Sequence, residues 1–151
     1  MSLSETISRD LQAAMKKGDT LRLETLRTIR AALLEKEIEK RGSAGGITPE
    51  DELGVLSASA KKRRESIELF RAGNRNELAD QEERELAIIQ EYLPKQLSAE
   101  EVEAIVKQVI QETGASGAKD FGKAMPVAMK SLKGKADGKM VQEMVKRILG
   151  A

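Results

Sequence analysis

Along almost the whole chain, apolar residues recur every three or four positions, the spacing that places them on one side of an α-helix. The first predicted helix begins at Ser2 or Ser4 and ends at Gly18, with Leu3, Ile7, Leu11 and Ala14 or Met15 on its apolar side. A second, capped by Asp19 or Thr20, extends to about Arg41, and its apolar side carries Leu23, Leu26, Leu33, Leu34 and Ile38. These positions predict a helical hairpin.

A second hairpin follows the flexible segment 42–46. Thr48 and Pro49 form a strong helix start, because a capping residue precedes a proline that suits the first helical position. This third helix ends near Gly73. A fourth helix, which Asn74 can cap, runs to residues 92–93, where Pro94 stops it. Residues 1–94 are therefore predicted to form an antiparallel helical bundle.

Residues 95–151 are predicted to form a three-helix domain. Ser98 and Glu101 have capping-box spacing, and the helix they start carries Val102, Ile105, Val106, Val109 and Ile110. Segment 114–117 forms a turn, Asp120 and Asp137 open two shorter helices, and Gly134 separates them. The fold class is therefore predicted to be all-α.

Composition agrees with helices and restricts the chemistry. Only 2% of the residues are aromatic, and the chain has neither cysteine nor histidine. This excludes disulfides, zinc sites of the Cys/His kind, and catalysis by a cysteine or by a serine with a histidine base. A serine–lysine pair stays formally open, but no motif presents one. We therefore expect no catalytic site, no metal and no cofactor. No signal peptide and no apolar run long enough to cross a membrane are apparent, which favours the cytoplasm.

Charge is distributed unevenly. Residues 1–113 contain 18 Lys and Arg against 22 Asp and Glu, whereas residues 114–151 contain 8 against 3. In a helical projection of the sixth helix, Phe121, Met125, Ala128, Met129 and Leu132 form the core side. Lysines occupy the opposite side and continue through the next turn, at Lys119, Lys123, Lys130, Lys133, Lys135 and Lys139. Lysines without interleaved acids suit contact with phosphates. The alternative is an ordinary solvated face.

Glycines and a basic run need separate interpretation. Gly122 would allow a ligand to approach closely or would serve packing, and Gly134 suits a helix C-cap. The run Lys61–Arg64 wraps around its helix, so Arg63 or Arg64 is expected to form interhelical ion pairs instead of contacting nucleic acid.

Several separated segments resemble the GatB/YqeY family in the same order: residues 21–27, 61–67, 72–75, 92–97 and 132–137. The resemblance implies a small, all-helical protein that is similar to the carboxy-terminal region of the B subunit of tRNA-dependent amidotransferases. That region resembles an appendage that binds the tRNA elbow while other domains perform the chemistry. Its motif falls on Gly122–Lys123, Met125, Met129–Lys130 and residues 133–137. Pro126 departs from the pattern, where a small residue is expected.

The resulting hypothesis is an accessory module that binds tRNA or another structured RNA. Its contacts would be Gly122, Lys123, Lys130, Lys133, Gly134, Lys135 and Lys139. Two alternatives are open: an adaptor for a protein partner in tRNA metabolism, and an enzyme of the glutamine-dependent amidotransferase class. No membrane partner or small-molecule substrate is evident from the sequence.

Overall fold

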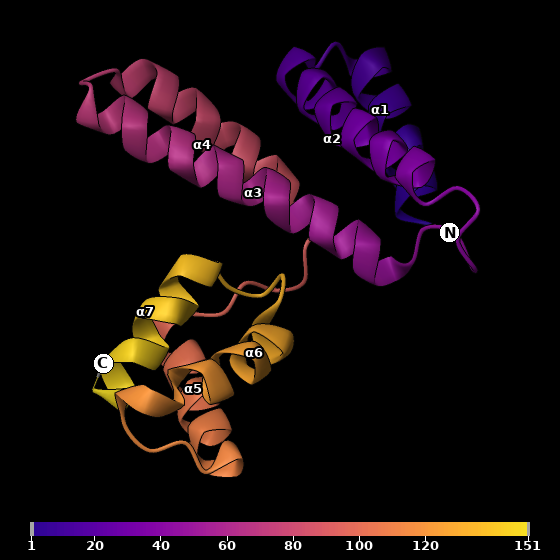
Figure 1. Ribbon diagram of the computed structural model, residues 1–151. Coiled ribbons are helices and arrows are strands. Elements are labelled where there is room, and N and C mark those ends of the chain that lie inside the picture. Colours follow the sequence, from indigo (N-terminus) through magenta and orange to yellow (C-terminus); the bar gives the residue numbers. More distant parts are fainter. Residues whose placement is uncertain (1, 151) are drawn as a thin grey trace. The chain divides into compact units, whose positions relative to one another are not determined.

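The computed structural model describes residues 2–150, and its regular secondary structure is entirely helical within that range (Figure 1). This confirms the predicted all-α class. The elements are α1 (Leu3–Lys17), α2 (Thr20–Glu39), α3 (Pro49–Ala72), α4 (Asn76–Gln90), α5 (Ala99–Thr113), the 3₁₀-helix η1 (Ala118–Asp120), α6 (Phe121–Leu132) and α7 (Gly138–Leu149).

The chain divides into two compact units. Unit 1 is Met1–Leu93 and contains α1 to α4, and unit 2 is Pro94–Ala151 and contains the remaining helices. Each unit has its own cluster of buried apolar side chains, and the two clusters share no residue. The units are therefore described one at a time.

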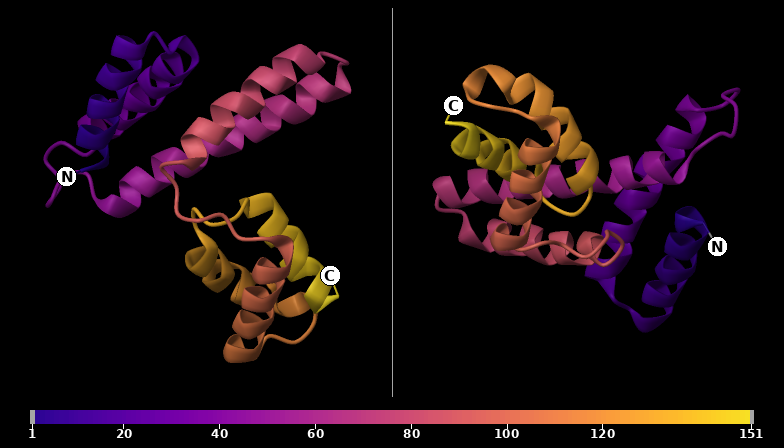
Figure 2. Two further views of the ribbon diagram at one scale, coloured as in Figure 1. Left: turned by 180° about the vertical axis from the view of Figure 1, so that it is seen from behind. Right: turned by 90° about the horizontal axis from the view of Figure 1, so that it is seen from below.

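Unit 1 consists of two antiparallel hairpins, α1–α2 and α3–α4 (Figures 1 and 2). In the right-hand view of Figure 2 the two hairpins run in clearly different directions, so they do not form a parallel stack. Predicted caps begin these helices: the Ser2 hydroxyl accepts from the Glu5 amide at 3.2 Å, and the Thr48 hydroxyl accepts from the Asp51 amide at 3.1 Å. Gly18 ends α1 in the left-handed conformation, with φ of 70°.

The core of unit 1 draws on all four helices. Its fully buried members include Ile7 from α1, Leu26 and Leu33 from α2, Leu56 from α3 and Ile89 from α4. Two residues of the predicted apolar side of α2 are not buried, because the crossing hairpins cover only part of that helix. Leu34 and Ile38 are 52% and 51% exposed.

The α3–α4 hairpin departs from the prediction at its turn and at its end. Asn74 does not cap α4; it adopts a positive φ of 58°, and α4 starts at Asn76 with no side-chain cap. The helix also ends at Gln90, before the predicted stop at residues 92–93. The expected interhelical ion pairs are confirmed, since Arg63 Nη1 lies 3.0 Å from Glu82 and 2.5 Å from Glu85, both on α4.

Unit 2 packs α5, α6 and α7 around a small core. Its buried side chains recur at helical spacing and are Val102, Val106, Val109, Ala124, Ala128, Leu132, Val141, Met144, Val145 and Leu149. As predicted, the Ser98 hydroxyl caps α5 by accepting from the Glu101 amide, at 3.2 Å. Asp120 stands at the N-cap position of α6, as predicted, but its carboxylate makes no capping hydrogen bond there and accepts from the Ser116 amide at 2.7 Å.

Candidate nucleic-acid interface

The lysine surface is built on α6, whose inner side is fixed by small residues. Ala124, Ala128 and Leu132 are buried at intervals of four residues, and Ala124 was not among the predicted core residues. The helical projection placed Phe121, Met125 and Met129 on the core side. These three side chains are half-buried and pack beside the buried core residues. Met129 contacts α7, because its Cε lies only 3.2 Å from where a Cβ on Gly138 would stand.

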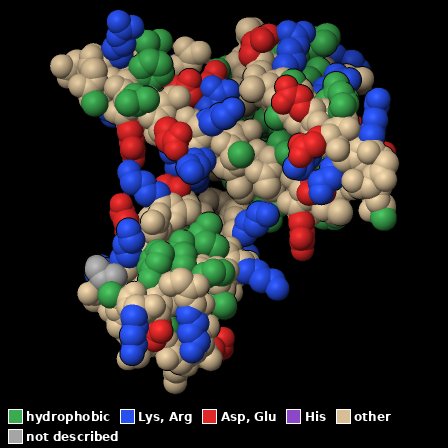
Figure 3. Space-filling model, in the orientation of Figure 1, with side chains coloured by type: hydrophobic (Ala, Val, Ile, Leu, Met, Phe, Trp, Pro, Cys, Tyr) green, Lys and Arg blue, Asp and Glu red, His purple; other side chains and the backbone are tan. Residues whose placement is uncertain are grey.

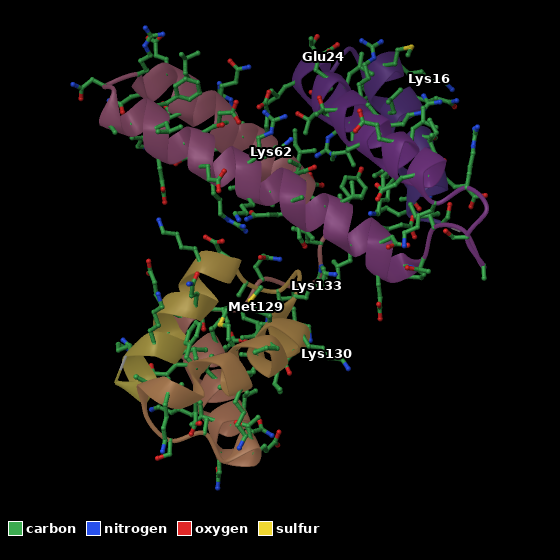
Figure 4. All side chains as sticks on the ribbon, in the orientation of Figure 1. Lys16, Glu24, Lys62, Met129, Lys130 and Lys133 are labelled. Carbon is green, nitrogen blue, oxygen red and sulfur yellow. The ribbon has the colours of Figure 1, made fainter. Side chains whose placement is uncertain are left out.

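The opposite side of α6 faces solvent. Lys123, Lys130 and Lys133 are exposed there, and Lys135 and Lys139 are exposed after the helix. Figure 4 shows Lys130 and Lys133 extending from α6 away from α5 and α7, and Figure 3 shows basic side chains projecting from this edge of unit 2. With a rise of 1.5 Å per residue, Lys123 and Lys133 are about 15 Å apart along the helix axis. We call Lys123, Lys130, Lys133 and Lys135 the lysine row.

The lysine row is not neutralised within residues 2–150. In that range no carboxylate forms an ion pair with any of its four lysines. The nearby aspartates are engaged with the backbone: Asp120 accepts from the Ser116 amide, and Asp137 from the Lys139 amide at 3.3 Å. Lys139 itself has an interaction partner, so we leave it outside the row. The four ammonium groups therefore concentrate positive charge on one exposed edge.

Three cations on α5 and α7 are engaged elsewhere. Lys146 on α7 lies over the ring of Phe121, with Nζ 5.7 Å from the ring centroid, a cation–π distance. Arg147 lies 3.6 Å from Glu103 on α5, and Lys107 lies 3.1 Å from the same carboxylate. These contacts separate the paired cations of α5 and α7 from the lysine row.

The two glycines predicted at the interface behave differently. Gly122 is exposed, has no positive φ, and a Cβ there would meet nothing within 4 Å, so packing does not explain it. Gly134 is buried and adopts a φ of 75° in the turn after α6. There the Lys135 amide donates to the Leu132 carbonyl at 2.9 Å.

Gly134 has a structural role in holding the segment before α5. Its carbonyl accepts from the Gln96 side chain at 2.7 Å, and the Leu97 amide donates to the Lys135 carbonyl at 2.9 Å. These contacts leave Gly134 buried in the turn after α6. A role of Gly134 in contacting RNA stays a prediction.

Pro126 lies on the exposed side of α6 between the lysines, next to Val127, which is 39% exposed. The helix continues through Pro126. Because proline has no amide hydrogen, the Gly122 carbonyl four residues earlier loses its intrahelical donor. The surface around the lysine row thus also offers an apolar centre at Pro126 and Val127, and a backbone acceptor at Gly122.

The fold and this surface define an all-helical protein of two small units, the second with a basic, exposed helix edge. A family model described as Yqey-like protein matches residues 4–149, and the chain belongs to this family.

Curated relatives are fungal. The "Altered inheritance of mitochondria protein 41, mitochondrial" of Pyrenophora tritici-repentis is 28% identical over 96% of this chain and 80% of its own length. The protein of the same name from Lachancea thermotolerans is 34% identical over 67% of this chain and 53% of its own length. A Schizosaccharomyces pombe protein named "Uncharacterized protein C22F3.15" is 31% identical over 64% of this chain and 76% of its own length.

Two of these relatives are named as mitochondrial proteins, whereas the sequence analysis predicts a cytoplasmic location for this chain. Among residues 2–150, no helix combines the length and the apolar character needed to cross a membrane. The cytoplasmic location stays a prediction.

Proposed function

We propose that this protein is a non-catalytic accessory module that binds structured RNA, with tRNA as the favoured partner. The observation that carries the proposal is the lysine row, four exposed ammonium groups on one edge with no carboxylate paired to them among the described residues. Binding to a polyanion releases its counterions, which favours such a surface at low salt. The resemblance of this segment to the tail of the amidotransferase B subunit supports tRNA over other RNAs.

The scarcity of aromatic side chains favours folded RNA over single strands. Recognition of unpaired bases relies on stacking against aromatic rings. Of the three aromatic residues, Phe121 is half-buried beneath Lys146, and Tyr92 and Phe70 lie in unit 1. The lysine row would therefore read the shape and the phosphates of a folded RNA.

The test uses the full chain and a matched pair of triple variants. Lys123→Gln, Lys130→Gln and Lys133→Gln remove three charges from the lysine row. Lys16→Gln, Lys17→Gln and Lys61→Gln remove three charges from exposed positions of unit 1. Fluorescence anisotropy with labelled tRNA should show weaker binding for the first variant, with the slope of log K against log salt smaller by about 3.

The control variant should bind tRNA with a nearly unchanged slope. Equal weakening in both variants would show that only net charge matters, and unchanged binding in the first would reject the lysine row. A competition with an unstructured RNA of equal length should favour tRNA.

A protein-adaptor role has one specific observation in its favour. Leu34 and Ile38 lie one turn apart on α2 and are both about half exposed, so together they leave an apolar surface that a partner protein could cover. Co-purification after nuclease treatment separates the two roles, because an association through RNA would disappear. Incubation of the pure protein with misacylated tRNA, glutamine and ATP tests the amidotransferase alternative, and we expect no product.

A further inference from the structure

A pocket of about 310 Å³ lies inside unit 1, between α2 and the α3–α4 hairpin. It is lined by Thr28, Ile29, Ala32, Ser59, Lys62, Arg63, Ser66, Glu82 and Ile89. Its volume is at the small end of the range of about 300–1,000 Å³ for ligand sites. The RNA-binding proposal makes no use of this pocket, which belongs to the other unit.

The sequence explains why this space stays open. Ser59, Lys62, Arg63 and Ser66 have the spacing of residues that share one face of a helix, so α3 turns polar side chains toward the pocket. The two serines are short, and Ala32 opposite them on α2 is also small. These short side chains leave the gap above the buried residues Ile29 and Ile89 unfilled.

The pocket lining contains two cations, and one of them is engaged. Arg63 is held between Glu82 and Glu85, with its side chain and those of both carboxylates 19% exposed or less. Lys62 forms no ion pair within residues 2–150. It is therefore the cation of this lining that a ligand can engage, and Figure 4 shows it on α3.

Two further donors in the pocket are unused. Among the described residues, the hydroxyls of Ser59 and Ser66 take part in no hydrogen bond within the protein. Thr28 differs, because its hydroxyl already donates to the Glu24 carbonyl at 3.1 Å. Lys62 lies three residues after Ser59 and four before Ser66, so the three side chains share one helix face.

We propose that this pocket binds a small molecule that carries one oxyanion group, either a phosphate ester or a carboxylate. Lys62 binds the oxyanion, Ser59 and Ser66 donate hydrogen bonds, and the uncharged part of the ligand packs on Ile29 and Ile89. Glu82, which also lines the pocket, is paired with Arg63 at 3.0 Å. Charged hydrogen bonds of this kind are stronger than neutral ones, which gives Lys62 the leading role.

The test is an NMR titration of the full-length protein with inorganic phosphate and, separately, with acetate, each at ionic strength held constant with sodium chloride. Backbone amides around Ser59, Lys62 and Ser66 should shift and saturate, with dissociation constants on the order of 1 mM for such minimal probes. Saturation with phosphate alone would assign a phosphate ester, and saturation with acetate alone a carboxylate. Saturation with both supports the shared oxyanion site.

Matched variants make the assignment specific. Lys62→Gln should weaken binding by about tenfold, whereas Lys61→Gln, which removes the same charge from an exposed neighbour outside the pocket, should not. Ser66→Leu should abolish binding by filling the space while every charge is kept. The proposal is overturned if neither probe shifts the pocket amides, or if the two lysine variants weaken binding equally. Retention of tRNA binding by Lys62→Gln would separate this site from the lysine row.

Discussion

The hydroxyl of Tyr92 donates a 2.7 Å hydrogen bond to the carboxylate of Asp10, a residue 82 positions earlier in the chain. Beside it, Arg22 Nη2 lies 2.6 Å from Glu91. Together the two contacts attach the segment after α4 to α1 and α2. The resemblance blocks 21–27 and 92–97 each contribute one of these residues, so both blocks have a structural role in closing unit 1.

Tyr92→Phe removes the hydrogen bond to Asp10 and should lower the free energy of unfolding by about 1–2 kcal/mol. The phenyl ring keeps the apolar contacts, but the partly buried Asp10 loses a donor, although Arg9 stays within 3.0 Å of it. Urea denaturation at neutral pH measures the difference. Arg9→Gln, at the exposed end of the same cluster, should cost much less; a cost equal to that of Tyr92→Phe would contradict the assignment.

The hydrogen bond between Tyr92 and Asp10 also predicts that the stability of the protein depends on pH. Burial, and then the hydrogen bond to Asp10, raise the pKa of Tyr92 above its ordinary value. The stabilisation that the protonated Tyr92 hydroxyl gives to the folded state is therefore complete below about pH 10. It is lost as the pH rises through the pKa of Tyr92 in the folded protein. The hydrogen bond from Tyr92 lowers the pKa of Asp10, and that contribution is present above about pH 4 and lost at lower pH.

The stability difference between the wild type and Tyr92→Phe should therefore be largest at intermediate pH and shrink at both extremes. Urea denaturation of both proteins across the pH range measures it. A difference that is constant with pH would show that the hydroxyl acts through packing alone.

Arg63→Ala should destabilise the protein by about 2–4 kcal/mol, because it leaves Glu82 and the buried Glu85 without their cation. Arg27→Ala is the matched control: Arg27 pairs with Glu24 at 2.7 Å, but both side chains are more than half exposed. Its loss should cost less than about 1 kcal/mol. Thermal and urea unfolding measure both variants, and equal costs would refute the role given to burial.

Gly122→Ala should raise the free energy of unfolding by about 0.5–1 kcal/mol, because alanine favours the helix and the added Cβ meets nothing. If RNA approaches the backbone here, the same methyl group should weaken tRNA binding. Ser131→Ala, on an exposed position of α6, is the control and should leave tRNA binding unchanged. A stabilised Gly122→Ala variant with full affinity would exclude close approach at this position.

Gly134→Ala should lower stability and leave tRNA affinity unchanged, the opposite of the result expected for Gly122→Ala. A residue with a Cβ strains the left-handed backbone of this turn, so we expect a loss of about 1–2 kcal/mol of stability. Because Gly134 is buried, tRNA affinity measured well below the unfolding temperature should not change. A specific loss of affinity in a fully folded variant would place Gly134 in the interface.

The sequence by itself determined the helical class, most helix starts and the lysine-rich side of α6. These follow from local physics: apolar spacing, the capping side chains of Ser2, Thr48 and Ser98, and glycine or proline at helix ends. Local rules failed at Asn74, where the turn geometry of the α3–α4 hairpin required a left-handed residue and delayed the start of α4.

Only the tertiary structure decided which surfaces are covered and which remain open. Leu34 and Ile38 continue the apolar pattern of α2, yet the second hairpin crosses the helix without covering them. In the sequence, Gly122 and Gly134 are both glycines near helix ends. In the structure, Gly122 is exposed to solvent, whereas Gly134 is buried and its carbonyl accepts a hydrogen bond from Gln96. The pocket at Lys62 arises because short side chains of α2 and α3 meet there. Burial depends on the partners that folding brings together, and spacing along one helix does not contain that information.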